Sequence, residues 1–352
     1  MEVEIELKLN TQAEAGPIIA KWLQGQSKIK VEHQEIELSN SYFDTPNRDF
    51  RKNDMGLRIR GLQHEYEQTL KTAGKGVAGL QHRPEYNVSL GLFETEEPSC
   101  PDLHLFPADI WPTGFHLEHI QQTLVCQFST QFTREQFLLT WPDETQVELV
   151  WDRGVVQASG LSDPISEIEL ELKKGKVERL FSLARQLAEL MPLAIGLQSK
   201  AARGYRLIDM ASAQAPAFLK TQQTLSNAEE LNQIVPALLP GQLAKVLKQW
   251  QKMDLSQDHN LLGRSVELSE LLVLLTVIVK RLNHANHNAV LQHCLHHLCT
   301  FQDELSKRQQ AVSACKPESI QQAEAKQALR AFALGKSMIL LQLDMMQWLS
   351  EA

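Results

Sequence analysis

The sequence lacks a paired cysteine framework and any long hydrophobic run. Its five cysteines are scattered and form no CxxC pair, which argues against a disulfide scaffold and favours a reducing compartment. The longest apolar run, Leu271–Val279, has nine residues even with Thr276 counted, whereas a membrane helix needs about 20. The first residues are acidic, unlike the basic and then apolar start of a signal peptide. We therefore predict a cytoplasmic protein without a membrane partner.

The chain also lacks a basic excess. Asp and Glu number 43 against 35 Lys and Arg, so the net charge of the 352 residues is −8. Proteins that coat nucleic acid normally carry surplus basic residues, and we expect no nucleic-acid partner. The charge is uneven, because residues 1–214 contain 31 acidic and 22 basic side chains, and the remainder contains 12 and 13. The acidity therefore belongs to the first part of the chain.

Two kinds of sequence meet near residue 210. Before it, short alternating segments separated by turn signals predict a strand-rich α+β domain over residues 1–210. Small and polar residues at 211–218 predict a linker. The remainder, 219–352, is rich in Leu and Gln and predicts an all-α domain. Its predicted helical stretches are 243–253, 265–298 and 320–349.

Charged residues alternate with aliphatic residues along several predicted strands. Glu4, Glu6 and Lys8 stand at every second position, so a strand places them on one face. The pattern recurs at Arg58 and Arg60, which flank Ile59. Other charged residues with a similar placement on predicted strands are Lys71, Arg83, Arg134, Asp152, Glu167, Glu169 and Glu171.

This alternation has two interpretations. The strands could form a sheet with a solvated charged face, or a closed barrel whose charged faces enclose a polar tunnel. In a tunnel the basic residues need a dense anion and the carboxylates need a cation. A polyphosphate with Mg²⁺ or Mn²⁺ satisfies both sets, because arginine and lysine hold phosphoryl oxygens and carboxylates hold hard metals. Alternation alone does not decide between a solvated charged sheet and a closed polar tunnel.

Several of these motifs together resemble one family. Glu4-Ile5-Glu6-Leu7-Lys8 matches the ExExK signature that opens the CYTH family, also called triphosphate tunnel metalloenzymes. The resemblance covers roughly residues 1–207. The elements that follow in family order are Tyr42–Pro46, Leu57–Arg60, Thr69–Lys71, Arg83–Glu85, Arg134, Asp152–Gly154, Glu167–Glu169 and Ser199–Lys200 with Arg203 and Arg206.

The resemblance implies an eight-stranded antiparallel β tunnel with flanking helices, followed here by the all-α domain. Glu85 and Arg203 are weaker assignments, because either could simply orient its neighbours, and Arg206 would be structural. Glu171 could replace Glu169 if the register differs by one pair. The implied metal ligands for Mg²⁺ or Mn²⁺ are Glu4, Glu6, Asp152, Glu167, Glu169 and Glu171. The implied phosphate binders are Lys8, Arg58, Arg60, Lys71, Arg83, Arg134, Lys200 and Arg203. The implied catalytic residues are Glu4, Glu6, Lys8 and Glu169.

The family contains inorganic triphosphatases, thiamine-triphosphate hydrolases and adenylyl cyclases. A helical second part resembles the bacterial two-domain inorganic triphosphatases, whose second domain is of the CHAD type. We therefore predict a metal-dependent enzyme that hydrolyses inorganic triphosphate to pyrophosphate and phosphate. The alternatives are a non-catalytic protein that binds polyphosphate, and an adenylyl cyclase or another organic triphosphate hydrolase.

The role of the helical part is open at this point. Five histidines lie between His284 and His297, and His293 and His297 are four residues apart, so one helical face could offer both to a metal. Solvated or packed histidines are the simpler interpretation, because no acidic residue lies between His284 and Thr300. The domain could be a divergent CHAD-like polyphosphate binder, or a structural part that forms a homodimer.

Overall fold

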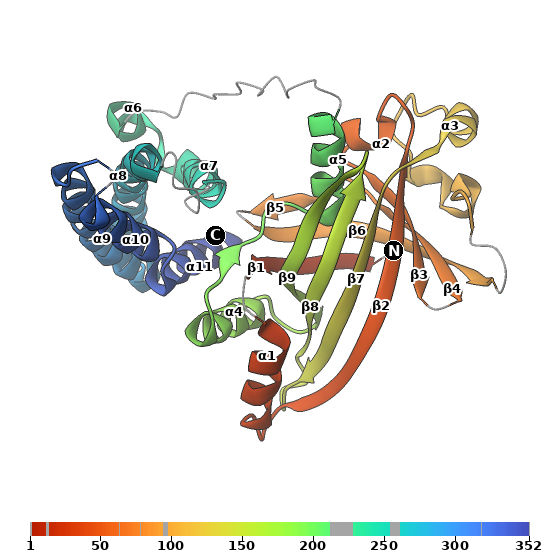
Figure 1. Ribbon diagram of the computed structural model, residues 1–352, viewed down its shortest axis with the longest axis horizontal. Helices are drawn as coiled ribbons and strands as arrows, with labels where there is room; N and C mark the ends of the chain where they lie inside the picture. The colour runs from red at the N-terminus through yellow and green to blue at the C-terminus, as the bar shows by residue number, and fades with distance from the viewer. Residues whose placement is uncertain are drawn as a thin grey trace.

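The computed structural model describes residues 2–11, 14–62, 64–77, 79–93, 98–211, 228–253, 261–317 and 319–351. Within these residues a strand-rich first part is followed by a helical second part (Figure 1). Most of the predicted linker, 212–218, lies outside the described residues. No helix in the described ranges has the length and apolarity needed to cross a membrane.

Eight strands close into an antiparallel barrel, which confirms the predicted fold class. Closure results because β1 pairs with β9 on one side and with β6 on the other. Two short strands, β10 (Ala194–Ile195) and β5 (Lys75–Val77), extend the sheet beyond the barrel. In pairing order the barrel strands are β1 (Glu2–Asn10), β9 (Leu161–Lys174), β8 (Gln146–Ala158), β7 (Val125–Thr140), β2 (Lys30–Asp44), β3 (Gly56–Leu62), β4 (Glu65–Lys71) and β6 (Leu80–Leu92).

The alternation in the sequence separates the two faces of the barrel wall. On β1, Leu7 and Leu9 are fully buried in a hydrophobic cluster, and Lys8 between them reaches carboxylates across the strand pair. On β8, Leu149 and Trp151 belong to the same cluster, whereas Asp152 pairs with charged side chains. The aliphatic residues therefore pack outside the barrel and the charged residues face inward.

Helices cover the apolar exterior of the barrel. Helices α1 (Ala15–Gln24) and α4 (Glu178–Leu190) bury apolar faces in the same cluster as β1 and β8 (Figure 1). A second cluster joins β3 and β4 to α2 (Asp49–Lys52) and α3 (Leu117–Thr123), with short 3₁₀ turns at 103–105 and 108–110. Helix α5 (Lys200–Ala211) packs on β7, β8 and β9.

The second part is a bundle of helices. Two of the predicted helical stretches, 265–298 and 320–349, are each divided into two helices, so their prediction as continuous helices was wrong. The stretch 265–298 divides at His287, whose φ of 49° leaves the helical region, and Asn288 caps the next helix through Val290 N. The stretch 320–349 divides at Leu334–Gly335. The helices are α6 (Ala228–Gln233), α7 (Leu239–Gln251), α8 (Leu261–Asn286), α9 (Ala289–Ala314), α10 (Ile320–Ala333) and α11 (Lys336–Glu351), with a 3₁₀ turn at 236–238.

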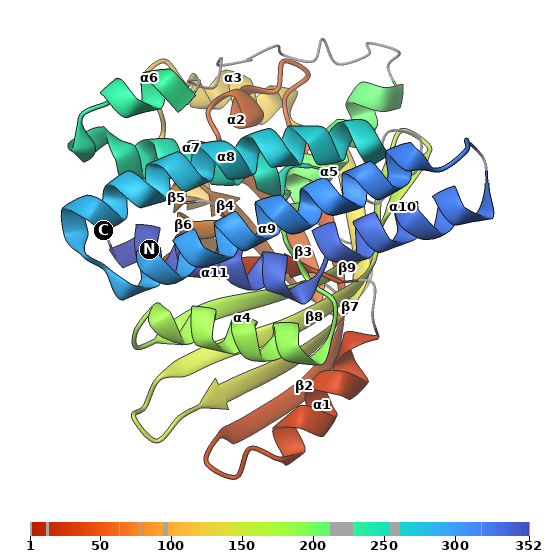
Figure 2. The same cartoon turned by 90° about the vertical axis from the view of Figure 1, so that its left-hand side faces the viewer.

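The two parts share one hydrophobic core. Helix α11 lies between the other helices and the barrel, where it packs on α4 (Figure 1 and Figure 2). Arg185 of α4 donates to Asp344 Oδ1 of α11 through Nε and Nη2, at 3.0 and 2.7 Å. Met346 is fully buried, and its Cε lies 3.2 Å from the position of a Cβ on Gly79, which has a φ of +106°. The helical part therefore also contacts the turn before β6.

We expect Met346→Ala to destabilise both parts together. Removal of a fully buried methionine side chain typically costs about 2–5 kcal/mol of unfolding free energy. Circular dichroism should show one cooperative transition at a lower temperature. Met210→Ala is the control, because this side chain is 55% exposed and its loss should change stability by less than about 0.5 kcal/mol. Two separate transitions, with only the helical one shifted, would contradict a shared core.

Candidate functional site

A charged cavity of about 440 Å³ lies inside the barrel. Its lining comes from the barrel strands, from Asp54 just before β3, and from the loop that leads into α5 together with the first residues of α5. Two further predicted site residues, Asp152 and Glu167, are almost completely buried beside it. The predicted site residues that line the cavity are Glu4, Glu6, Lys8, Arg58, Arg60, Lys71, Arg83, Arg134, Glu169, Glu171 and Lys200.

Strand register brings the carboxylates to one wall. In the β1–β9 pair, Lys8 is opposite Glu169 and Glu6 is opposite Glu171. In the β8–β9 pair, Asp152 is opposite Glu167. Successive inward residues of three neighbouring strands thus form rows of charge, which no single stretch of sequence contains.

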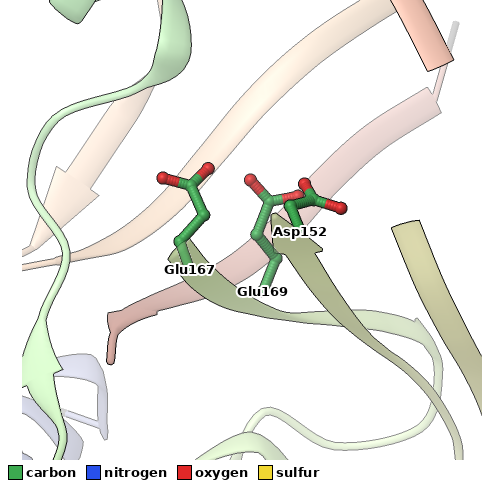
Figure 3. Close-up of side chains that lie close together, drawn as sticks. All are labelled: Asp152, Glu167 and Glu169. Carbon is green, nitrogen blue, oxygen red and sulfur yellow. The ribbon is translucent and has the colours of Figure 1, made fainter. Parts of the chain in front are cut away.

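Asp152, Glu167 and Glu169 form a compact acidic group. Each offers an oxygen, and these oxygens lie within 4.8 Å of one another, on adjacent strands β8 and β9 (Figure 3). Arg134 donates to both Asp152 oxygens, at 2.8 and 2.7 Å, and to Glu169. Lys8 and Lys200 also donate to this group. We call Asp152, Glu167 and Glu169 the carboxylate triad.

The pKa values of this group reflect strong mutual pairing. Burial alone would raise the pKa of Glu169, but Lys200, Lys8 and Arg134 hold it well below its usual value. Burial alone would lower the pKa of Lys8, but Glu167 and Glu169 raise it well above its usual value. Glu169 and Lys8 therefore stay ionised at neutral pH.

The triad fits a hard divalent cation. Three carboxylates at close range provide the oxygen ligands that Mg²⁺ and Mn²⁺ prefer. Among the described residues, the buried Glu167 Oε2 accepts no hydrogen bond, and Arg203 Nη1 lies 3.6 Å from it. A buried carboxylate oxygen without a donor is costly unless a cation satisfies it.

The opposite wall, from β3, β4 and β6, is basic. Arg58 lies 3.5 Å from Glu85 Oε1, and Lys71 contacts both Glu85, at 3.1 Å, and Glu4. The Arg58 Nε is buried and makes no hydrogen bond within the described chain. Glu85 is therefore placed between two cations, and an orienting role for it stays a prediction.

Arg60 is the least compensated cation of this wall. It donates to Asn40 Oδ1 at 3.0 Å, and no described carboxylate lies within ion-pair distance of it. Burial, with Arg58 and Arg134 nearby, lowers the pKa of Arg60 to about 10. An arginine in this position favours an anion in the cavity.

Glu171 shows the reverse imbalance on the acidic wall. Burial, together with nearby Glu4 and Glu148, raises its pKa to about 7, although Lys173 donates to it at 2.6 Å. Each wall thus favours an additional ion of the opposite sign. The arrangement suits a ligand that carries an anion on one side and a metal cation on the other.

Arg203 is a predicted phosphate binder that lies outside the lining of the cavity. Arg203 donates to Asp163 at 2.7 Å and to the Pro164 carbonyl, and it is not among the lining residues. Arg206 also donates to Asp163, which suits the structural role expected for it. Arg83 lines the cavity, and its guanidinium donates to backbone carbonyls of Thr72 and Asp54.

Several lining residues were missed at the sequence level. Glu148 precedes Asp152 by four residues on β8, and Glu67 precedes Lys71 by four on β4, so the same two-residue alternation could have found both. Lys173 continues the alternation of Glu167, Glu169 and Glu171. The other unpredicted lining residues with polar side chains are Tyr42, Asp54, Thr69, Gln81, Asn87 and Ser199. Apart from Asp54, these residues are uncharged, so an alternation of charge could not have identified them.

The closed antiparallel barrel with inward charges defines the class of this protein, a charged β tunnel. The model of the CYTH domain family matches residues 2–205. The chain therefore belongs to the CYTH domain family.

A curated relative allows a direct comparison. Over 206 residues the chain is 39% identical to an inorganic triphosphatase from Haemophilus influenzae, and the match covers 58% of this chain and 54% of the relative. The chain thus spans about half the length of the curated relative it matches.

Solved structures give weaker likenesses. A Hippeastrum protein described as a candidate adenylyl cyclase with dominant triphosphatase activity is 19% identical, with 58% of this chain and 95% of that chain covered and a TM-score of 0.41. A solved inorganic triphosphatase is 20% identical, with 52% and 80% covered and a TM-score of 0.22. Neither likeness bears on activity.

We expect Arg60→Gln to leave the unfolding free energy of the ligand-free protein unchanged or raised, because it removes a charge repelled by Arg58 and Arg134. The matched variant Arg134→Gln should lose about 3–5 kcal/mol, because it leaves Asp152 and Glu169 buried with less compensation. Urea unfolding of both variants measures the difference. Equal losses would show that Arg60 is a structural cation like Arg134.

Proposed function

We propose that the chain is a metal-dependent inorganic triphosphatase, which hydrolyses inorganic triphosphate to pyrophosphate and phosphate inside the tunnel. The observation that carries the proposal is the division of the cavity into a basic wall around Arg60 and an acidic wall that includes Glu169 and Glu171. A triphosphate with a divalent cation complements both walls at once. The 39% identity to an inorganic triphosphatase agrees with this assignment.

The character of the lining favours an inorganic substrate. Tyr42 and Leu197 are the large side chains with substantial apolar surface among the described lining residues. Tyr42 is 8% exposed and stacks on Phe128 with ring centroids 4.7 Å apart. A nucleobase or a thiamine ring needs apolar or aromatic surface for binding, and this cavity offers little.

The residues of the tunnel divide the work of phosphoryl transfer. Arg58, Arg60, Lys71 and Arg83 would hold phosphoryl oxygens from the basic wall, and Lys8, Arg134 and Lys200 from between the carboxylates. We assign Glu4, Glu6, Glu171 and the carboxylate triad as the residues that would hold Mg²⁺ or Mn²⁺. When bound, such a metal supplies charge neutralisation for the phosphoryl oxygens.

The other features of the function stay predictions. A polyphosphate-binding role for the helical part, with CHAD-like character, rests on resemblance. A homodimer through that part is a prediction from its apolar stretches at Leu271–Val279 and Met338–Leu349. A cytoplasmic location is likewise a prediction. An adenylyl cyclase activity is less favoured because of the polar lining.

Turnover of three substrates separates the candidate functions. The purified chain with Mg²⁺ or Mn²⁺ should release phosphate from inorganic triphosphate at least tenfold faster, in kcat/KM, than from ATP or thiamine triphosphate. A phosphate-release assay measures this. Tight binding of long polyphosphate without turnover of any substrate would favour the non-catalytic alternative, and cyclic AMP formation would favour the cyclase.

Glu6→Gln should abolish metal-dependent turnover while the barrel remains folded. Glu6 lines the cavity, and its carboxylate provides charge that an amide lacks. Loss of at least a hundredfold in kcat is expected, with circular dichroism unchanged. Glu32→Gln on β2 is the control, because Glu32 is exposed and pairs with Lys30. Full activity of Glu6→Gln would refute the assignment of this residue.

A further inference from the structure

The ammonium group of Lys200 lies among the carboxylates that suit a metal. Its Nζ donates to Asp152 Oδ2 at 2.6 Å, to Glu167 Oε1 at 2.5 Å and to Glu169 Oε1 at 3.2 Å. It therefore touches all three members of the carboxylate triad, whose oxygens lie within 4.8 Å of one another. Steric exclusion and charge repulsion keep an ammonium group and a divalent cation from sharing this position.

The helix that carries Lys200 is fastened at several points. Arg203 and Arg206 both donate to Asp163 of β9, at 2.7 and 2.5 Å. Tyr205 donates to the buried Asp44 at 2.6 Å. A Cβ on Gly204 would come within 2.2 Å of the Phe128 ring, so this helix lies directly on β7. These contacts hold the backbone of α5, so the flexible lysine side chain is the part free to move.

Lys200 has a second environment within reach. Its side chain lines the cavity in addition to contacting the triad, and its Nζ lies 4.8 Å from the centre of the Phe132 ring. Lys8 makes a similar double contact, since it lines the cavity and donates to Glu167 at 3.0 Å. Arg134, by contrast, is held by a bidentate pair with Asp152. Of these three cations, Lys200 is the one that donates to all three members of the triad, whereas Lys8 and Arg134 each donate to two.

We propose that Lys200 is an internal counter-ion of the metal site, which a divalent cation displaces and which then binds the phosphate. The metal takes the place of the ammonium among the triad, and the released ammonium adds one positive charge to the cavity. Metal binding thus raises the affinity for triphosphate, and by reciprocity triphosphate raises the affinity for the metal. This counter-ion role of Lys200 rests on the proposed function only for the identity of the anion.

Mn²⁺ binding to the full chain without triphosphate tests the displacement. Lys200→Met removes the competing cation, so titration followed by electron paramagnetic resonance should show about tenfold tighter Mn²⁺ binding, within the range typical of coupled sites. Lys200→Arg keeps the charge and should bind Mn²⁺ as the unmodified chain does. Lys174→Met is the control, because Lys174 pairs with Glu144 outside the cavity.

The coupling provides a second readout. In the unmodified chain Mn²⁺ should increase the calorimetric affinity for inorganic triphosphate, and Lys200→Met should lose about tenfold of that increase. Mn²⁺ affinity of Lys200→Met that is equal to or weaker than that of the unmodified chain would overturn the inference. If Lys200→Met binds Mn²⁺ more tightly but the unmodified chain does not turn over triphosphate, the proposed function is refuted and the displacement of Lys200 is still supported.

A measurement on the unmodified chain covers the case in which Lys200→Met fails to fold. Acetylation of Lys200 by acetic anhydride, quantified by mass spectrometry, should increase at least threefold on addition of Mg²⁺, because the ammonium leaves its carboxylates. Lys174 should react at the same rate with and without Mg²⁺. Unchanged or slower acetylation of Lys200 would also overturn the inference.

Discussion

The pairing of buried carboxylates with buried cations is the constraint on which the rest of this structure depends. Asp152 and Glu167 are almost completely removed from solvent, and an ionised carboxylate in that position is tolerated only with hydrogen-bonded cations around it. Lys8, Arg134 and Lys200 provide them from three different elements. Loss of one partner leaves an uncompensated charge in the centre of the barrel.

A barrel with a charged interior must place its apolar residues outside. Leu7 and Leu9 of β1 and Leu149 of β8 are fully buried because helices cover that outer surface. Helix α4 forms part of the cover, and α11 of the helical part packs on α4 in turn. The helical part is therefore tied to the tunnel through the same requirement that makes the tunnel polar.

Much of this arrangement is predictable from local pattern. The alternation at Glu4–Lys8 and at Glu167–Glu171 predicts which side chains point into the barrel and which point outward, because successive side chains of a strand point to opposite faces. The pairing of Lys8 with Glu169, which selects one register, joins strands about 160 residues apart and is absent from any local window. Arg203 illustrates the limit, since the family resemblance implies that it binds phosphate, whereas its guanidinium donates to Asp163 and it does not line the cavity. Helix α8 ends just before His287, which has a positive φ, and nothing in the histidine-rich sequence predicts this backbone conformation.

A crystal structure of the chain with inorganic triphosphate and Mn²⁺, with data recorded at the manganese absorption edge, tests the central claim most directly. The account predicts an anomalous peak within coordination distance of carboxylates among Glu4, Glu6, Glu171 and the triad. It also predicts the triphosphate in the barrel, with phosphoryl oxygens against Arg58 and Arg60. Triphosphate bound outside the barrel, or manganese remote from these carboxylates, would contradict it.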